Sequence, residues 1–209
     1  MSTHRVFLLS PADCGGERAR LVLRKEARFA LAHEVQSRAG APIGDVFTFL
    51  SGLYFRGKLA YARVFARPPA DAPGIYVITA GGGLLTADVR INARRLRGFE
   101  RVPVDPADHR FRRPLLRDAR RLDAEHPDCE FILLGSIATG KYVDILHGIF
   151  GARLRFPAEF VGRGDMSRGG LLLRCVRDSM ELEYTGIDGS ARRGRRPPRL
   201  KPVRWKVGP

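Results

Sequence analysis

The sequence has few cysteines, no long apolar run and a minority of acidic residues. Its three cysteines, Cys14, Cys129 and Cys175, form no CxxC pair, which argues against a disulfide framework and a zinc site. We therefore expect reduced thiols, no metal and no cofactor. No apolar stretch reaches the ~18 residues of a membrane span. The amino terminus lacks a signal peptide's pattern because Asp13 closely follows a short apolar run, so we expect a cytoplasmic protein with no membrane partner.

Acidic residues are outnumbered by basic ones. The chain has 37 Lys and Arg against 22 Asp and Glu, a formal net charge of +15. Such a charge favours nucleic acid or a nucleotide as partner, because basic side chains neutralise phosphates. The alternative is an arginine-rich composition without a polyanionic partner. Eight of the basic residues share the C-terminal segment: Arg192, Arg193, Arg195, Arg196, Arg199, Lys201, Arg204 and Lys206.

Hydrophobic residues make up 44% of the 209 residues, enough for one packed core. Short apolar runs predict strands at 5–9, 74–80 and 131–134. Helical spacing predicts helices over 17–38, with a break near Arg24, and over 59–66, 108–125 and 140–150. Strands that alternate with helices predict an α/β fold, a single domain with a largely parallel central sheet flanked by helices. We expect this domain over 1–188 and a flexible, basic tail rich in Pro and Arg over 189–209.

Shorter elements are predicted between and after these. A short helix is expected over 92–98 and an edge strand over 99–104. Further strands are expected at 154–156, 171–176 and 182–184, the last two as a hairpin. A polar glycine-arginine loop would then occupy 162–170.

Three loops follow the predicted strands, at 10–16, 81–83 and 135–141. The carboxyl ends of parallel strands meet at one edge of a sheet, where α/β proteins bind ligands. Consecutive glycines around Gly82 would let the backbone approach such a ligand closely. The sequence therefore predicts one binding site shared by these loops.

The segment GSIATGK, residues 135–141, has the spacing of a phosphate-binding loop between a strand and a helix. Backbone N–H groups and a lysine at a helix amino terminus would face an anion there. Tyr142 stands where such loops carry a magnesium-binding Ser or Thr, so ATPase or GTPase activity is not expected. A phosphate or ribose contact and a plain strand-to-helix turn both stay open. The candidate contacts are Gly135, Ser136, Thr139, Gly140 and Lys141.

The segment GRGDMSRGG, residues 162–170, brings arginines and a carboxylate together. Arg163 and Arg168 suit phosphates, and Ser167 could add a hydrogen bond. Asp165 is the candidate catalytic acid or base. The alternative is a surface turn with an internal Asp–Arg pair.

Two further segments carry candidate anion or substrate contacts. SPADCGGER contains Ser10, Cys14 and Arg18, and it could be a ligand loop, hold a cysteine nucleophile or simply begin a helix. In SGLYFRGK, Tyr54 could stack on a base and Lys58 could meet a phosphate. A loop between helices, with Tyr54 in the core, is the alternative.

Parts of the first half resemble a known family. FLLSPADC, at 7–14, resembles the opening of the peroxide-stress YaaA-like proteins. LYFRGKLAYARVF at 53–65, followed by IYVITAGGGLLTADVRI at 75–91, resembles related uncharacterised YaaA-like domains of nucleic-acid-modification loci. The resemblance implies an α/β fold related to uracil-DNA glycosylases, with DNA or nucleobase binding. It does not extend to 135–141 or 162–170.

Three functions follow from these patterns. The first is a protein that binds nucleic acid or a nucleotide and acts on a nucleobase or its N-glycosidic bond, with Asp165 as acid or base. The second is a non-enzymatic DNA- or RNA-binding protein that uses its basic face and tail. The third is a transferase or hydrolase of a small phosphorylated metabolite. The pattern leaves the substrate and the oligomeric state open.

Overall fold

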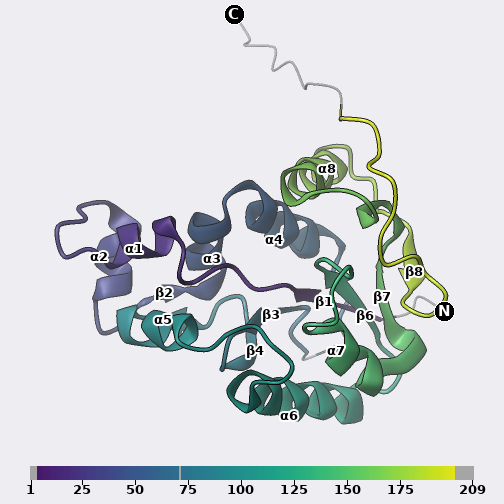
Figure 1. The fold of residues 1–209 in the computed structure, drawn as a ribbon, viewed down its shortest axis with the longest axis horizontal. Coiled ribbons are helices and arrows are strands. Elements are labelled where there is room, and N and C mark those ends of the chain that lie inside the picture. The colour runs from purple at the N-terminus through teal and green to yellow at the C-terminus, as the bar shows by residue number, and fades with distance from the viewer. Residues whose placement is uncertain (1–3, 71, 201–209) are drawn as a thin grey trace, which may run out of the picture.

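A six-stranded sheet organises the computed structural model, which describes residues 4–70 and 72–200. Its strand order is β4-β3-β1-β6-β7-β8 (Figure 1). The four central strands are parallel, and the two edge strands pair antiparallel with their neighbours. This confirms the predicted α/β fold with its largely parallel sheet. The strands are β1 (Arg5–Leu9), β3 (Ile75–Thr79), β4 (Gly83–Thr86), β6 (Glu130–Leu134), β7 (Leu154–Pro157) and β8 (Tyr184–Gly186).

Helices cover both faces of this sheet (Figure 1). Two 3-10 turns, at Gly151–Arg153 and Ala158–Phe160, flank β7, and β2 (Ala41–Pro42) pairs with β5 (Arg90–Ile91) in a small second sheet. The predicted break near Arg24 is confirmed, since Arg24 lies between α1 and α2. The helices are α1 (Glu17–Leu23), α2 (Ala30–Gln36), α3 (Ile43–Ser51), α4 (Leu53–Phe65), α5 (Ala93–Glu100), α6 (His109–Glu125), α7 (Val143–Phe150) and α8 (Asp165–Arg177).

After Arg5, strand β1 is apolar because both of its faces are buried, as is typical of parallel sheets. Phe7 and Leu9 join the core formed with α3, α4 and α8. Val6 and Leu8 join the core formed with α6 and α7 on the other face. Among the described residues, no helix is both long and apolar enough to cross a bilayer.

The predicted strand at 171–176 and the predicted loop at 162–170 are wrong, because α8 runs through both. Leu171, Leu172 and Cys175 are its buried side, at helical spacing. Gly169 serves a helix crossing: an added Cβ would lie 2.7 Å from the carbonyl oxygen of Leu53 in α4. A Cβ added to Gly57 of α4 would likewise lie 2.7 Å from the carbonyl oxygen of Gly169. These glycines therefore let two helices touch closely.

The predicted edge strand at 99–104 is also wrong. Phe99 belongs to α5 and packs edge-on against Phe47, with ring centroids 6.4 Å apart. The predicted hairpin between 171–176 and 182–184 does not form either, because β8 pairs with β7 instead. Two predicted helices exist with shifted starts: α4 begins at Leu53 and α7 at Val143.

The order of the parallel strands reverses between β1 and β6. The chain leaves β1 through α1 to α4 on one face to reach β3, and it returns through α6 on the other face to reach β6. Diverging connections of this kind open a crevice at the carboxyl ends of the two strands. The loops predicted at 10–16, 81–83 and 135–141 do follow the parallel strands β1, β3 and β6, although β4 already begins at Gly83.

The C-terminal segment over 189–200 runs from β8 past α8 (Figure 1). Arg192 pairs with Asp144 of α7 at 2.8 Å. The backbone carbonyl oxygen of Arg195 lies so close to Gly162 that an added Cβ there would collide with it, and Leu200 packs on Gly170. The remaining tail residues, including Lys201, Arg204, Trp205 and Lys206, lie outside the described residues. The division into a domain and a tail stays a prediction.

Candidate functional site at the carboxyl edge of the sheet

A buried lysine lies where β1 ends. Helix α4 places Lys58 in the interior with 0% exposure. Its Nζ donates to the carbonyl oxygen of Ser10 at 2.7 Å and to the Ser10 Oγ at 2.8 Å. Ser10 directly follows β1 and is 6% exposed. We call these two residues the Ser10–Lys58 pair.

Aromatic rings surround the lysine. Its Nζ lies 4.5 Å from the ring centroid of Tyr54 and 4.7 Å from that of Phe55, so cation–π attraction offsets part of the lost hydration. The Tyr54 hydroxyl is buried. Burial raises the pKa of this phenol, whereas the charge of Arg168 and a hydrogen bond with its side chain act in the opposite direction. Arg168 of α8 therefore lies beside Tyr54.

The loop after β6 packs directly onto Ser10. A Cβ added to Gly135 would lie 2.8 Å from the Ser10 Cβ and 2.8 Å from the Tyr142 hydroxyl. The Tyr142 hydroxyl donates to the carbonyl oxygen of Ser136 at 3.2 Å. Burial raises the pKa of Tyr142, and the Ser10 side chain opposes this shift. Gly135 is therefore required by the close approach of two strands' loops.

Helix α8 brings charges to the same place. Arg168 is only 7% exposed, and its Nε and Nη2 donate to the carbonyl oxygen of Phe160 at 3.2 and 3.0 Å. Its Nη1 donates to Asp165 at 3.3 Å. Asp165 lies in the first turn with its side chain 69% exposed. The site thus has a buried cationic side and an exposed carboxylate.

Burial lowers the pKa of Lys58 to about 7, although the charge of Asp165 opposes this and that of Arg168 adds to it. At neutral pH both the charged and the neutral form of this amine are therefore populated. Such lysines serve as acids and bases in enzymes. A lysine with a purely structural role would be buried in the same way. A catalytic role for Lys58 must therefore be argued from the positions of its neighbours as well.

The structure brings several of the predicted site residues together and separates others. Cys14 is buried, and its thiol donates to the carbonyl oxygen of Ala12 at 3.6 Å. Burial, with the charges of Asp13 and Glu100, raises the pKa of Cys14 to about 12, so it is not a reactive thiolate at neutral pH. Arg18 donates to the carbonyl oxygen of Phe49 at 3.1 Å and joins α1 to α3. The residues that gather around Lys58 are Ser10, Tyr54, Gly135, Ser136, Asp165 and Arg168.

Gly82 lies at a different cavity, of about 450 Å³, that also includes Arg95 and Phe99. Thr139 and Lys141 are exposed on the loop after β6. The Gly140 Cα faces the Asp144 carboxylate so closely that an added Cβ would collide with it. An acidic group thus stands at the amino terminus of α7, which favours the strand-to-helix turn for GSIATGK.

Arg163 and Ser167 lie on a neighbouring cavity of about 350 Å³, between α8 and the C-terminal segment. The Arg163 side chain donates to the carbonyl oxygen of Glu159 at 3.0 Å and to the Ser167 Oγ at 3.3 Å. Arg196 and Arg199 line the same cavity. These residues therefore extend the basic surface away from the Ser10–Lys58 pair.

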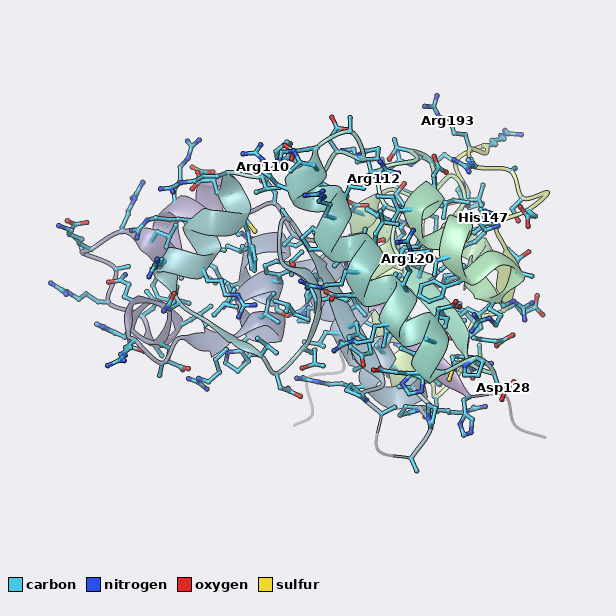
Figure 2. The ribbon with its side chains drawn as sticks, turned by 90° about the horizontal axis from the view of Figure 1, so that it is seen from below. Arg110, Arg112, Arg120, Asp128, His147 and Arg193 are labelled. Carbon is cyan, nitrogen blue, oxygen red and sulfur yellow. The ribbon has the colours of Figure 1, made fainter. Side chains whose placement is uncertain are left out.

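The exposed side of α6 is a second charged region, which the sequence interpretation left out of the site. An open cavity of about 610 Å³ lies over it and includes His109 and Leu116. Figure 2 shows Arg112 and Arg120 on this helix, toward α7. The sequence of this helix does place arginines opposite its apolar side. An ordinary surface helix has the same pattern, so the pattern alone does not indicate a binding face. We define the α6 arginine face as Arg112, Arg113, Arg117 and Arg120.

Tyr142 was missed as a member of the site. The sequence interpretation treated it only as a residue that replaces a magnesium ligand. Its contact with Ser10 depends on how two strands align, and no local pattern reports that. Among the described residues, no three His, Cys, Asp or Glu side chains gather in a way that could hold a metal ion.

No protein-family model matches this chain, and neither a curated protein nor a solved structure is significantly similar to it. The resemblance of the first half to YaaA-like proteins therefore stays a prediction.

Proposed function

We propose that the protein binds nucleic acid, and that the α6 arginine face contacts the phosphate backbone. The observation that supports this is a row of exposed arginines over an open cavity of about 610 Å³. Phosphate contacts by arginine are bidentate and release counterions. The formal net charge of +15 would steer the polyanion toward this surface.

Three of the four arginines of this face are available because no acidic side chain among the described residues neutralises them. Arg112, Arg113 and Arg120 make no side-chain hydrogen bond or ion pair with any residue that the structure describes. Arg117 is paired with Asp118 at 2.8 Å and is still 72% exposed. A face that served only solubility would mix charges of both signs, so the uneven charge favours an anionic partner.

The arrangement also suits the spacing of phosphates. Arg113 and Arg120 are two helical turns apart, roughly 10 Å at 1.5 Å per residue. A nucleic-acid strand rises about 3.4 Å per nucleotide, so this interval spans about three nucleotides. A second cavity of about 440 Å³ continues the surface between α6 and α7. Its carboxylate, Asp144, is paired with Arg192.

The burial of the aromatic side chains favours double-stranded over single-stranded nucleic acid as the partner. None of the phenylalanine and tyrosine side chains that the structure describes is exposed. Binding to single strands depends on exposed rings on which bases stack. Without base stacking, the arginines would contact mainly the phosphates. Such contacts favour binding to a double helix with little sequence preference.

The test is the salt dependence of binding to a short DNA duplex. We expect the double variant Arg113→Glu/Arg120→Glu to bind at least ~10-fold more weakly at moderate salt. The slope of log K against log salt should become shallower by about 2, because roughly one unit is lost for each phosphate contact.

A matched control exists on α4, which covers the other face of the sheet. Arg56 and Arg63 are exposed, have the same seven-residue spacing and make no side-chain hydrogen bond or ion pair among the described residues. The variant Arg56→Glu/Arg63→Glu has the same net charge as the α6 variant. Equal weakening by both double variants would show that only net charge matters, and the assignment to α6 would be wrong.

A second candidate function, action on a nucleobase or its N-glycosidic bond, is favoured by the position of Asp165. This exposed carboxylate acts electrostatically on Lys58, which contacts Ser10 at the carboxyl end of β1. A carboxylate there could stabilise positive charge on a sugar or activate water. The YaaA-like resemblance implies a fold related to uracil-DNA glycosylases, with DNA or nucleobase binding, which agrees with this candidate. Asp165→Asn should then retain duplex binding and lose turnover, whereas unchanged turnover would remove Asp165 from this role.

A further inference from the structure

The Ser10–Lys58 pair has the geometry of a nucleophile and its base. Lys58 Nζ lies 2.8 Å from the Ser10 Oγ, within the distance needed for direct proton transfer. We propose that Ser10 is a nucleophilic serine activated by Lys58, and that it attacks the carbonyl carbon of a neutral carboxylic ester or amide. This inference does not depend on nucleic-acid binding.

The surroundings keep the pair in place. The Nζ is also bonded to the Ser10 carbonyl oxygen at 2.7 Å, so the lysine cannot swing away from the serine. Lys58 is 0% exposed and Ser10 is 6% exposed. Of the two residues, Ser10 is the one that retains some exposed surface. It directly follows β1, where the strand order reverses, and ligands bind at this position in sheets of this class.

The groups that face Lys58 leave its amine able to act as a base. Burial lowers its pKa to about 7, Asp165 opposes this and Arg168 contributes to it. Tyr54 and Tyr142 beside the pair are neutral phenols, because burial raises the pKa of both. Near neutral pH a large fraction of Lys58 is then an amine that can accept the serine proton.

The same neighbours favour a neutral substrate over a phosphate. The Arg168 donors are directed at the Phe160 carbonyl oxygen and at Asp165, so they are already used. The exposed Asp165 carboxylate would repel an anion.

The step balances with water as the only co-reactant. The Ser10 Oγ forms a bond to the carbonyl carbon while its proton moves to Lys58 Nζ. The bond from that carbon to the leaving oxygen or nitrogen then breaks, and the Lys58 ammonium returns the proton to the leaving group. Water attacks the acyl-serine with Lys58 again as base, which releases the acid and restores the serine.

A fluorophosphonate probe tests the proposal on the full-length protein, because it labels activated serines. We expect labelling of Ser10, located by mass spectrometry of peptides, and turnover of p-nitrophenyl acetate. Ser10→Ala should abolish both. Lys58→Met should slow labelling by at least ~100-fold, the loss expected for a missing general base. The control is Ser37→Ala, an exposed serine at the end of α2, which should label like the wild type.

Each outcome decides the proposal. Labelling of Lys58→Met at the wild-type rate would overturn the role of the base, and labelling at another residue would overturn that of Ser10. If Lys58→Met does not fold by circular dichroism, the pH profile of the wild type replaces it. The labelling rate should rise as pH passes about 7, and a flat profile would overturn the pair. Wild-type protein that binds duplex DNA but is not labelled would refute this inference and leave the proposed function standing.

Discussion

The Ser10–Lys58 pair and the α6 arginine face are both basic, yet they treat charge in opposite ways. Lys58 is fully buried, bonded to two atoms of Ser10 and surrounded by rings. Arg112 and Arg120 are exposed and unpaired within the described residues. A buried charge must find partners within the protein because water is absent. An exposed arginine keeps its hydration and stays available to a partner from outside.

This contrast predicts that the buried basic residue contributes to the stability of the fold, whereas the exposed basic residues contribute to binding. Removing Lys58 should therefore unfold the protein more readily, whereas removing an arginine of α6 should not. The four experiments below separate these expectations, from the largest effect on stability to the smallest.

Lys58→Ala should lower the free energy of unfolding by about 3 kcal/mol, because it leaves a cavity and an unpaired Ser10. Lys58→Met should stay within about 1 kcal/mol of the wild type, since it fills the same volume without a buried charge. Urea denaturation measures both. A loss below about 1 kcal/mol for Lys58→Ala would show that this lysine is not part of the core.

Gly135→Ala should cost about 2 kcal/mol, because its methyl group would press on the Ser10 Cβ and the Tyr142 hydroxyl, each 2.8 Å away. Gly148→Ala on α7 is the matched control, since nothing lies within 4 Å of its added Cβ. That substitution should stabilise the helix by up to about 1 kcal/mol. Thermal denaturation of the pair would give shifts of opposite sign, and equal shifts would contradict the close approach at Ser10.

Stability should rise with pH between about 7 and 8.5. The folded-state pKa of Lys58 is lowered from 10.5 to about 7, so in this range the unfolded chain holds a proton that the folded protein has lost. Unfolding then takes up a proton, which adds up to about 1.4 kcal/mol per pH unit to the free energy of unfolding.

Lys58→Met should remove this slope, and urea denaturation at several pH values measures it. The range stops at 8.5 because Cys14 acts in the opposite direction at higher pH. Its folded-state pKa is raised from 9.0 to about 12, so stability falls once the thiol of the unfolded chain ionises. If the free energy of unfolding has the same pH slope in the wild type and in Lys58→Met, the titration of Lys58 is not its cause.

Arg112→Ala and Arg120→Ala should each change the free energy of unfolding by less than about 0.5 kcal/mol, because neither side chain has a hydrogen-bond or ion-pair partner among residues 4–70 and 72–200. The same variants should weaken duplex binding. A destabilisation above about 1 kcal/mol would mean that these arginines support the fold, and the contrast with Lys58 would disappear.

Local patterns were sufficient for much of the fold. Strands β1, β3 and β6 are short apolar runs between turn residues, and α6 has an apolar side at helical spacing, so neighbours in sequence report these elements. The strand-and-helix alternation also predicted the parallel sheet and the common edge of the loops at Ser10 and Gly135. These predictions depend on the spacing of apolar residues and on local composition, which can be read from a short stretch of sequence.

The apolar run at 171–176 shows where local patterns fail. Six apolar or mixed residues after a glycine-rich stretch read equally well as a strand or as one side of a helix. In the structure this segment is part of α8, and Gly169 and Gly57 let α8 pack closely against α4. Contacts between residues more than 100 positions apart therefore decided the structure of this segment.

The sequence by itself determined the α/β class, the excess of positive charge and the residues at the carboxyl edge of the sheet. Only the tertiary structure decided that Lys58 is buried against Ser10 and that Tyr142 joins them. It also decided that Arg112, Arg113 and Arg120 of α6 have no side-chain partner among the described residues. The physical reason is distance along the chain. Burial and hydrogen bonding depend on which elements pack together, and Ser10 and Lys58 meet across 48 residues because α4 lies over the end of β1.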